Sequence, residues 1–236
     1  MFTSWENLPA DLRKEAVKPY CEILRTKKAS LVVKRVCDIV FSLLLMIISA
    51  PLSIVIALLT VLFSGFPIFF RQDRITRYGK PFKILKFRTM KRDHDGAVLT
   101  VKDDQRVTAL GKFLRSTRFD ELPQLINVLK GDMSFVGTRP ELPSFVERYS
   151  EEMKATLLMR AGITSRASVA FIREDELLAN IPADKVADFY TESILPAKMR
   201  YNLEYIRRFS AVEDIKIIGL TVKSFLERLF GKESEQ

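Results

Sequence analysis

One long apolar stretch limits how this chain can fold. No charged residue occurs between Ile39 and Phe70, a run of 32 residues. A membrane-spanning helix needs about 20 apolar residues, and a soluble helix of this length and composition is unusual. The run is not N-terminal and lacks a small-residue cleavage site, so we do not interpret it as a signal peptide. The sequence therefore predicts contact with a membrane.

The stretch is predicted to break in its middle, at Ser49-Ala50-Pro51. Proline has no N–H, and its ring collides with the preceding helical turn. The Ser49 hydroxyl can bond a backbone group that the break sets free. Each half is then a helix of about 18 Å at 1.5 Å per residue. Neither half crosses a bilayer core of about 30 Å, so we predict a helix–break–helix with Ser49 and Pro51 at the break.

Basic residues flank both ends of the stretch. Four precede it between Lys27 and Arg35, and nine follow it between Arg71 and Arg92. Lysine and arginine stay on the cytoplasmic side of bacterial membranes, so both flanks obey this rule only if both ends lie on one face. We therefore expect a re-entrant helix that enters one leaflet and returns. One kinked, tilted transmembrane helix is the alternative.

Composition excludes several classes of protein. The net charge of +9 indicates an anionic partner, and 47% apolar residues argue against intrinsic disorder. Two cysteines, Cys21 and Cys37, exclude a disulfide scaffold and a cysteine zinc cluster. The single histidine, His94, excludes a multi-histidine metal site and makes a Ser-His-Asp triad improbable.

The organisation predicted for the chain is a mostly helical α+β protein with a small β element and amphipathic helices at the membrane interface. We divide it into an amphipathic N-terminal appendage over residues 1–30, the membrane helix over 31–70, and a cytoplasmic catalytic domain over 71–236. The appendage carries a stripe of Leu8, Leu12 and Val17.

Local patterns place the elements of the third region. Residues 82–88 predict a short strand, residues 92–104 with His94 a polar loop, and residues 122–130 a helix. A second apolar stripe lies near the C-terminus and fits either a core helix or a helix on the membrane surface. It consists of Ile215, Ile218, Val222, Phe225, Leu226 and Leu229.

Asp120 and Glu121 stand at the predicted start of the 122–130 helix, which Gly131 ends. A structural interpretation is that Asp120 caps the helix and both acids complement its dipole. A chemical interpretation uses the same geometry. Nearby Arg115 and Arg118 would lower the carboxyl pKa further, and an ionised, oriented carboxylate can attack phosphorus. Glu121 could then bind Mg²⁺. Spacing alone leaves both open.

Several segments together resemble the bacterial sugar transferase family, the monotopic phosphoglycosyl transferases that act on polyprenyl phosphate. The most specific is the long motif from Arg115 through Asp120-Glu121 to Gly137, and the resemblance covers about residues 31–230. The other matching segments are Lys34-Arg35-Val-Cys-Asp38 with the break at Ser49–Pro51, Phe82–Met90, Arg139-Pro140, and the run Ile194–Lys198 with Tyr205–Arg208 and Asp214–Lys216.

The resemblance implies a reaction. A nucleotide diphosphate sugar, usually a UDP-sugar, gives its sugar-1-phosphate to undecaprenyl phosphate at the cytoplasmic face of the bacterial inner membrane, and UMP is released. Asp120 would be the nucleophile that carries phospho-sugar covalently, and Glu121 with Asp120 would hold Mg²⁺. By similarity the phosphates would be bound by Arg115, Arg139, Lys86, Arg88 and Arg173. Membrane lipid is an implied partner, and a homodimer is left open.

The chain departs from the family pattern at three turns. Thr138 replaces the first proline of the usual Gly-Pro-Arg-Pro, and Ala161 and Ser165 replace proline and the last glycine of Arg-Pro-Gly-Ile-Thr-Gly. Losing proline changes turn rigidity, and serine removes the glycine's freedom for positive φ. Arg173 stands one residue from its expected place. We expect these changes to affect donor specificity more than reaction type.

Two other classes of function account for part of the sequence. A non-enzymatic membrane scaffold would account for the apolar stretch and its basic flanks but not for the Asp120-Glu121 motif. A membrane-tethered nucleic-acid-binding protein would account for the charge. The sequence has no recognised nucleic-acid motif and no aromatic residues interleaved with basic ones, so we expect no nucleic-acid partner.

Overall fold

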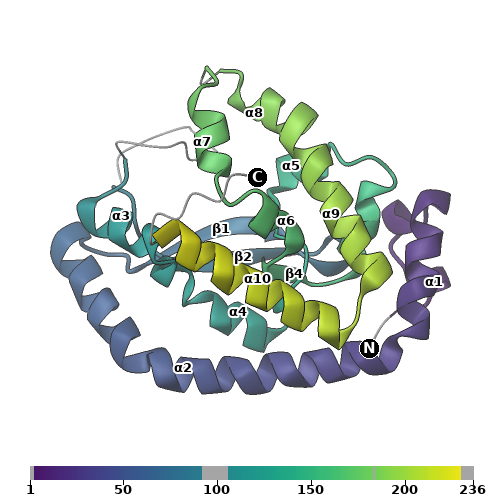
Figure 1. Ribbon diagram of the computed structural model, residues 1–236, viewed down its shortest axis with the longest axis horizontal. Helices are drawn as coiled ribbons and strands as arrows, with labels where there is room; N and C mark the ends of the chain where they lie inside the picture. The colour runs from purple at the N-terminus through teal and green to yellow at the C-terminus, as the bar shows by residue number, and fades with distance from the viewer. Residues whose placement is uncertain (1–2, 92–105, 183, 230–236) are drawn as a thin grey trace.

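The computed structural model describes residues 3–91, 106–182 and 184–229. It is a mostly helical α+β structure with one long apolar helix and two small sheets (Figure 1). The predicted mostly helical α+β class with a small β element is therefore confirmed. The polar loop predicted over 92–104, with His94, lies outside the described residues.

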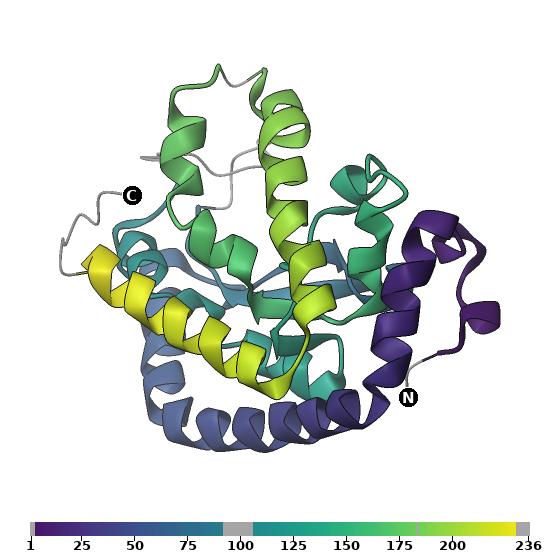
Figure 2. The same ribbon diagram turned by 45° about the vertical axis from the view of Figure 1, so that its right-hand side comes forward.

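The long helix α2 runs from Lys28 to Ser64 and contains Pro51. Figures 1 and 2 show it as a curved rod along one side of the molecule, turning at one end. Helix α2 is continuous through Ser49–Pro51, so the kink predicted there does not end the helix. A proline removes only one backbone donor, so the turns on either side can keep their hydrogen bonds while the axis bends. By length and composition, α2 is long and apolar enough to cross a membrane.

The surface of α2 is largely apolar and exposed. Ile47 is 72% exposed and Leu62 75% exposed, and similar side chains continue along most of its length. Contiguous apolar surface on this scale is rare on monomeric soluble proteins and marks a membrane or interaction site. The last apolar residues, Phe69 and Phe70, already belong to strand β1.

The first part of α2 is bound to the folded unit by charged groups. Lys34 forms a partly buried ion pair of 2.7 Å with Asp214 of α10 (Ala211–Leu229). The Arg35 guanidinium donates to the last carbonyls of α4 (Gln124–Lys130), with distances of 2.6 Å to Val128 and 2.9 Å to Leu129. A cation at a helix C-terminus satisfies carbonyls that lack intrahelical partners.

Asp38, one turn further along α2, is also buried and points into the protein. Its Oδ1 accepts hydrogen bonds from the Ser134 hydroxyl (3.0 Å) and the Phe135 backbone N–H (3.1 Å), both in strand β3 (Met133–Val136). A buried carboxylate needs such partners to offset its lost hydration. The segment Lys34–Asp38 therefore fixes α2 against α4, β3 and α10.

The other end of α2 is bound by Arg88. Its guanidinium donates to the carbonyls of Ser64, Gly65 and Phe66, where the helix ends. Gly65 takes the left-handed φ of 69° that ends a helix with least strain in glycine. Both ends of one apolar helix are thus bound to the same folded unit.

The two sheets are small. Strands β1 (Phe69–Ile75) and β2 (Pro81–Phe87) form an antiparallel hairpin. Strand β3 pairs in parallel with β4 (Ala161–Thr164). The strand predicted over 82–88 is therefore confirmed with a shift of one residue. Phe82 and Ile84 of β2 pack with Val128 and Met133, which joins the hairpin to α4 and β3.

Short helices complete the unit. In chain order they are α3 (Ala109–Ser116), α5 (Pro143–Val146), α6 (Arg166–Ala170), α7 (Glu174–Ala179) and α8 (Val186–Phe189), and 3-10 turns lie at Phe119–Glu121 (η5) and Met153–Leu158 (η6). A π turn over Tyr190–Ile194 (η7) joins α8 to α9 (Leu195–Arg208), and two buried clusters form around α9.

The N-terminal segment packs into this core rather than standing apart as an appendage. It comprises 3-10 turns at Trp5–Asn7 (η1), Ala10–Leu12 (η2) and Glu15–Val17 (η3), followed by α1 (Lys18–Thr26). The predicted stripe is buried: Val17 is fully buried and Leu12 is 2% exposed. In Figure 1, α1 lies beside α9.

The C-terminal stripe faces outward. Ile215 is 70% exposed and Val222 52% exposed, whereas Ile217 on the opposite side is fully buried. Of the two interpretations left open by the sequence, a core stripe is wrong for Ile215, Ile218, Val222 and Leu226. Helix α10 presents one apolar face to the core and a second to the surroundings.

Replacing Arg88 by methionine should lower the free energy of unfolding by about 3–5 kcal/mol, because several carbonyls lose a buried charged donor at once. Denaturant unfolding in detergent measures this. Arg71→Met is the matched control, because Arg71 is an exposed arginine on the same hairpin and should change stability by under about 0.5 kcal/mol. Equal effects of the two changes would contradict the role of Arg88 in binding the end of α2.

Candidate active site

Asp120 and Glu121 lie in the 3-10 turn η5, immediately before α4. Of the two interpretations that the sequence left open for Asp120, the helix cap is not observed, because Pro123 precedes α4 and no side chain caps that helix. The chain enters η5 through Arg118, which takes a left-handed φ of 58°. This tight entry turns both carboxyl groups inward, where Asp120 is 5% exposed and Glu121 8%. Gly131 ends α4 with φ 90°, as predicted.

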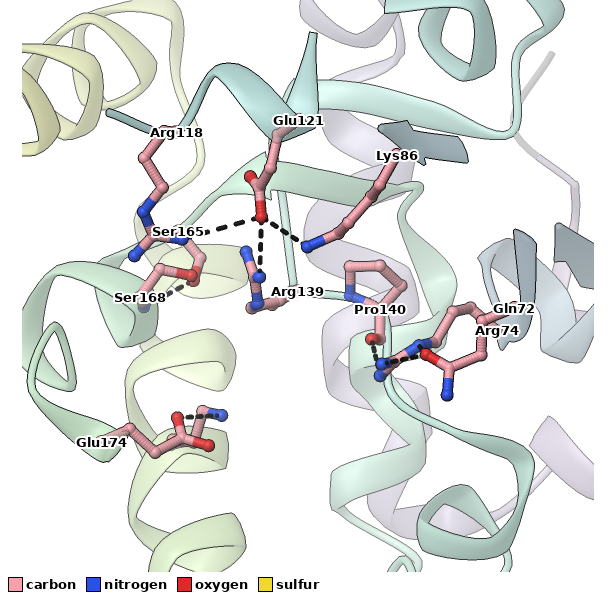
Figure 3. Close-up of polar contacts among 11 residues, drawn as sticks. Gln72, Arg74, Lys86, Arg118, Glu121, Arg139, Pro140, Ser165, Ser168 and Glu174 are labelled. Carbon is pink, nitrogen blue, oxygen red and sulfur yellow. Dashed lines mark hydrogen bonds and ion pairs between the residues drawn. The ribbon is translucent and has the colours of Figure 1, made fainter. Parts of the chain in front are cut away.

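Glu121 lies at the centre of a cluster of cations (Figure 3). Its Oε1 accepts from the Lys86 ammonium at 2.7 Å and from the Arg139 guanidinium at 3.1 Å. Arg118 approaches the same oxygen to 3.7 Å. The cations come from strand β2, from the loop after β3 and from the turn before η5. One buried oxygen thus joins three separate segments, which we call the Glu121 cluster.

The cluster fixes the charge of Glu121. Burial would raise its pKa, but Lys86, Arg139 and Arg118 outweigh burial and hold the pKa far below its usual range. Glu121 in turn raises the pKa of Arg139. Burial lowers the pKa of Lys86, an effect that Glu121 opposes. The result is an ionised carboxylate surrounded by an excess of positive charge, which suits a polyanionic ligand.

Asp120 behaves in the opposite way. Burial raises its pKa, and the cations Lys86 and Arg115 reduce this effect without cancelling it, while Glu121 adds to it. The expectation of a lowered pKa is therefore wrong, because the sequence does not reveal how deeply the group is buried. Its Oδ1 is buried and has no hydrogen-bond partner among the described residues. A carboxylate with a raised pKa is more basic and hence a stronger nucleophile once ionised.

The other predicted phosphate-binding residues are distributed differently. The Arg115 Nε donates to the Thr89 hydroxyl at 2.9 Å, and its charge acts on Asp120. Arg88 contacts the end of α2, and Arg173 faces Glu176 at 3.9 Å on a side chain that is 53% exposed. The structure therefore brings Lys86 and Arg139 to Glu121, and it gives Arg88 and Arg173 partners outside the cluster.

Arg118 is the cluster member that the sequence does not place in the predicted site. The sequence predicts only its effect on the pKa of Asp120. The available signal was its spacing, three residues before Glu121. A left-handed Arg118 is uncommon for a residue with a side chain, and such backbone conformations concentrate at functional sites.

The loop that carries Arg139 is fixed by close backbone packing. A side chain at Gly137 would overlap the Arg160 carbonyl, and one at Gly162 would overlap the Gly137 backbone. Ser165 needs no positive φ: it has φ −156° and caps α6 by accepting from the Ser168 N–H at 2.9 Å. The serine that replaces the family's glycine is therefore accommodated as a helix cap.

A second network of buried charged groups lies outside the Glu121 cluster. Lys198 of α9, 3% exposed, contacts Glu174 at 2.8 Å, the Tyr190 hydroxyl at 3.0 Å and Glu141 at 3.7 Å. Tyr190 donates to the same Glu141 at 2.8 Å. This network links α7, η7 and α9 to the residue two places after Arg139.

Two carboxyl groups, Asp120 and Glu121, are adjacent at the site. No group of three or more His, Cys, Asp or Glu side chains gathers elsewhere in the described part of the chain. Mg²⁺ often uses one or two carboxylates and takes its remaining ligands from water and substrate phosphates. The unpartnered Asp120 Oδ1 and the ionised Glu121 fit that pattern, provided that a phosphorylated ligand supplies the other oxygens.

Comparison with known proteins identifies a family that this chain matches. A profile described as "Bacterial sugar transferase" matches residues 29–228. A Bacillus subtilis protein named as a putative undecaprenyl-phosphate N-acetylgalactosaminyl 1-phosphate transferase is 49% identical over 125 residues, covering 52% of this chain and 70% of its own.

Two further relatives are named as UDP-glucose:undecaprenyl-phosphate glucose-1-phosphate transferases, and each is 38% identical. The match to the Caulobacter vibrioides protein covers 82% of this chain and 69% of that relative. The match to the Escherichia coli protein covers 83% of this chain and 40% of that relative. The chain thus spans well under half of the E. coli relative.

The two acids should have opposite effects on stability. Glu121→Gln should lower the free energy of unfolding at pH 7 by about 3–5 kcal/mol, because three cations lose their buried partner. Asp120→Asn should leave it unchanged or raise it, because the raised pKa means that ionised Asp120 is disfavoured in the fold. Denaturant titrations of both variants measure the difference.

The pH dependence follows from the same shifts. The lowered pKa of Glu121 stabilises the fold above the unfolded pKa of about 4.3, and this contribution is lost as the pH falls below it. The difference between wild type and Glu121→Gln should therefore shrink in acid. A Glu121→Gln variant as stable as wild type at pH 7 would show that the cluster does not stabilise the fold.

Proposed function

Because the chain belongs to the bacterial sugar transferase family, we propose that it transfers a sugar-1-phosphate from a nucleotide diphosphate sugar to undecaprenyl phosphate, with Asp120 as the covalent nucleophile. The donor is a UDP-sugar, and the products are undecaprenyl diphosphate sugar and UMP. The names of the matched relatives describe the same class of reaction with different sugars. The sugar is therefore set by details of the pocket and not by the family.

One observation carries this proposal. A buried carboxylate with a raised pKa and an unpartnered oxygen, Asp120, lies next to an ionised glutamate that holds three cations in place. Cations that are already oriented bind phosphate without reorganisation, and the adjacent carboxylate supplies the electron pair. A scaffold protein needs neither feature.

The chemistry divides into two displacements at one phosphorus. An Asp120 carboxylate oxygen attacks the phosphorus that bears the sugar, and the bond from that phosphorus to the bridging oxygen breaks. UMP leaves with that oxygen. A phosphate oxygen of undecaprenyl phosphate then attacks the same phosphorus and displaces the Asp120 carboxylate, which restores the enzyme.

The side chains of the Glu121 cluster have distinct tasks in this scheme. Arg139 and Lys86 bind the phosphoryl oxygens and offset their charge as they spread in the transition state. Glu121 positions both cations beside Asp120. Mg²⁺, when bound by Asp120 and Glu121, would neutralise the diphosphate further. Arg115 acts on Asp120 by its charge.

The placement of α2 favours the re-entrant arrangement. Lys34–Asp38 binds α4, β3 and α10, while Arg88, which follows strand β2, binds the other end of the helix. A folded polar unit lies on one side of a bilayer. A helix whose two ends both contact that unit therefore begins and ends on the same side. We therefore place residues 31–70 in one leaflet as a bent helix and residues 71–236 at the cytoplasmic face, with the exposed stripe of α10 on the same surface.

Purified protein with Mg²⁺, undecaprenyl phosphate and a panel of UDP-sugars should release UMP with at least one donor. Asp120→Asn should lower that rate by at least roughly a thousandfold, because the amide cannot form the covalent intermediate. UMP detection measures turnover, and mass spectrometry of the intact protein detects phospho-sugar attached to it.

Glu151→Gln is the matched acid-to-amide control, because Glu151 is an exposed residue outside the cluster and should keep the wild-type rate. Turnover of Asp120→Asn at the wild-type rate would exclude Asp120 as the nucleophile. Absence of UMP with any UDP-sugar would argue against this donor class.

Cysteines placed at residues 28 and 80 should both lie on the cytoplasmic side. In a background with exposed Cys37 replaced by serine, Lys28→Cys and Lys80→Cys should resist a membrane-impermeant maleimide in intact spheroplasts and react after lysis. Ile47→Cys, in the middle of α2, should react neither in intact spheroplasts nor after lysis. Labelling of one flank in intact spheroplasts would establish a spanning helix instead.

A further inference from the structure

Helix α4 buries two side-chain amides in opposite situations. Asn127 is 1% exposed and fully used: its amide donates to the Lys83 carbonyl at 2.9 Å, and its Oδ1 accepts from the Leu85 N–H at 3.0 Å. Gln124 is equally buried, at 1% exposed, yet neither its Nε2 nor its Oε1 has a hydrogen-bond partner among the described residues. Asn127 therefore joins α4 to β2, and Gln124 has no such explanation.

A buried amide without hydrogen-bond partners requires an explanation. Removing such a group from water without a hydrogen bond is costly, and native proteins rarely leave both ends of an amide unsatisfied. Where they do, a functional ligand, an ion or an ordered water supplies the missing partners. The position of Gln124 decides which of these fits.

Gln124 lies on the face of the chain that carries the candidate active site. Glu121, Gln124 and Asn127 follow at intervals of three, a spacing that places side chains on one side of successive turns. Glu121 and Asn127 both contact β2, through Lys86 and through Lys83 and Leu85. Gln124 lies between these two contacts and four residues after Asp120, whose Oδ1 is the other unpartnered buried atom of this segment.

We propose that the Gln124 side-chain amide is a further substrate-binding group, which donates from Nε2 to an oxygen of the phosphoryl group that Asp120 attacks. A phosphoryl group carries acceptors only, so it matches an amide donor that lacks a partner. Three cations border the site, and two remain partly open to solvent, with Arg118 43% and Arg139 31% exposed, which leaves an anion a path inward. This inference rests on the proposed function.

The phosphoryl oxygen can come from the nucleotide sugar or from undecaprenyl phosphate. Two half-reactions separate these sources. Formation of the covalent intermediate from UDP-sugar alone reports on the donor phosphate, and transfer from that intermediate to undecaprenyl phosphate reports on the lipid phosphate.

The test compares Gln124→Met with Asn127→Leu. Gln124→Met keeps the side-chain volume and removes an unpartnered amide, so the melting temperature should stay the same or rise while one half-reaction slows by roughly 10- to 100-fold. Asn127→Leu should lower the melting temperature by several degrees, because it breaks bonds to β2. A stability gain together with an activity loss is the signature of a group kept for a ligand.

Two results would overturn the inference. One is a Gln124→Met rate within about twofold of wild type in both half-reactions. The other is a fall in melting temperature like that of Asn127→Leu, which would make Gln124 a structural amide. A ligand assay keeps the inference separate from the proposed function: UDP should raise the melting temperature of wild type and raise that of Gln124→Met less. If wild type forms no intermediate, the proposed reaction fails, and equal UDP shifts in both proteins would then overturn the role of Gln124 as well.

Discussion

The buried Oε1 of Glu121 is the point on which the candidate site depends. Lys86 and Arg139 reach it from other segments of the chain, and Arg118 reaches it from three residues earlier. Without a shared anion these cations would repel one another at close range. One carboxylate therefore sets the positions of three cationic side chains. Its neighbour Asp120 is left with a raised pKa and a free oxygen, so adjacent acids take different roles because their surroundings differ.

The second constraint is that the apolar helix is bound at both ends. Arg35 and Asp38 form hydrogen bonds with α4 and β3, respectively, and Arg88 forms hydrogen bonds with the end of α2. Arg88 stands two residues after Lys86, which contacts Glu121. Arg88, which binds the end of the apolar helix, and Lys86, which contacts Glu121, are therefore carried by one short segment. This segment fixes the position of the apolar helix relative to the Glu121 cluster.

The sequence predicted the elements better than their contacts. Pro51 indicated a bend, but the continuity of α2 depends on hydrogen bonds that the neighbouring turns retain. The helical pattern and Gly131 located α4, yet the left-handed Arg118 and the turn η5 moved Asp120 from a cap into the interior. Arg88 and Arg173 looked equivalent to Lys86 and Arg139 as basic residues, because charge alone does not say which partner a side chain reaches.

By itself the sequence determined the long apolar segment, the mostly helical class and the family motif around Asp120-Glu121, because apolar runs, helical periodicity and adjacent residues are local properties. The tertiary structure alone decided which cations meet Glu121, in which direction the pKa of Asp120 moves, and that Gln124 is buried without a partner. These depend on burial and on contacts between residues distant in the chain. Desolvation and ion pairing act through space, and no local pattern in the sequence encodes them.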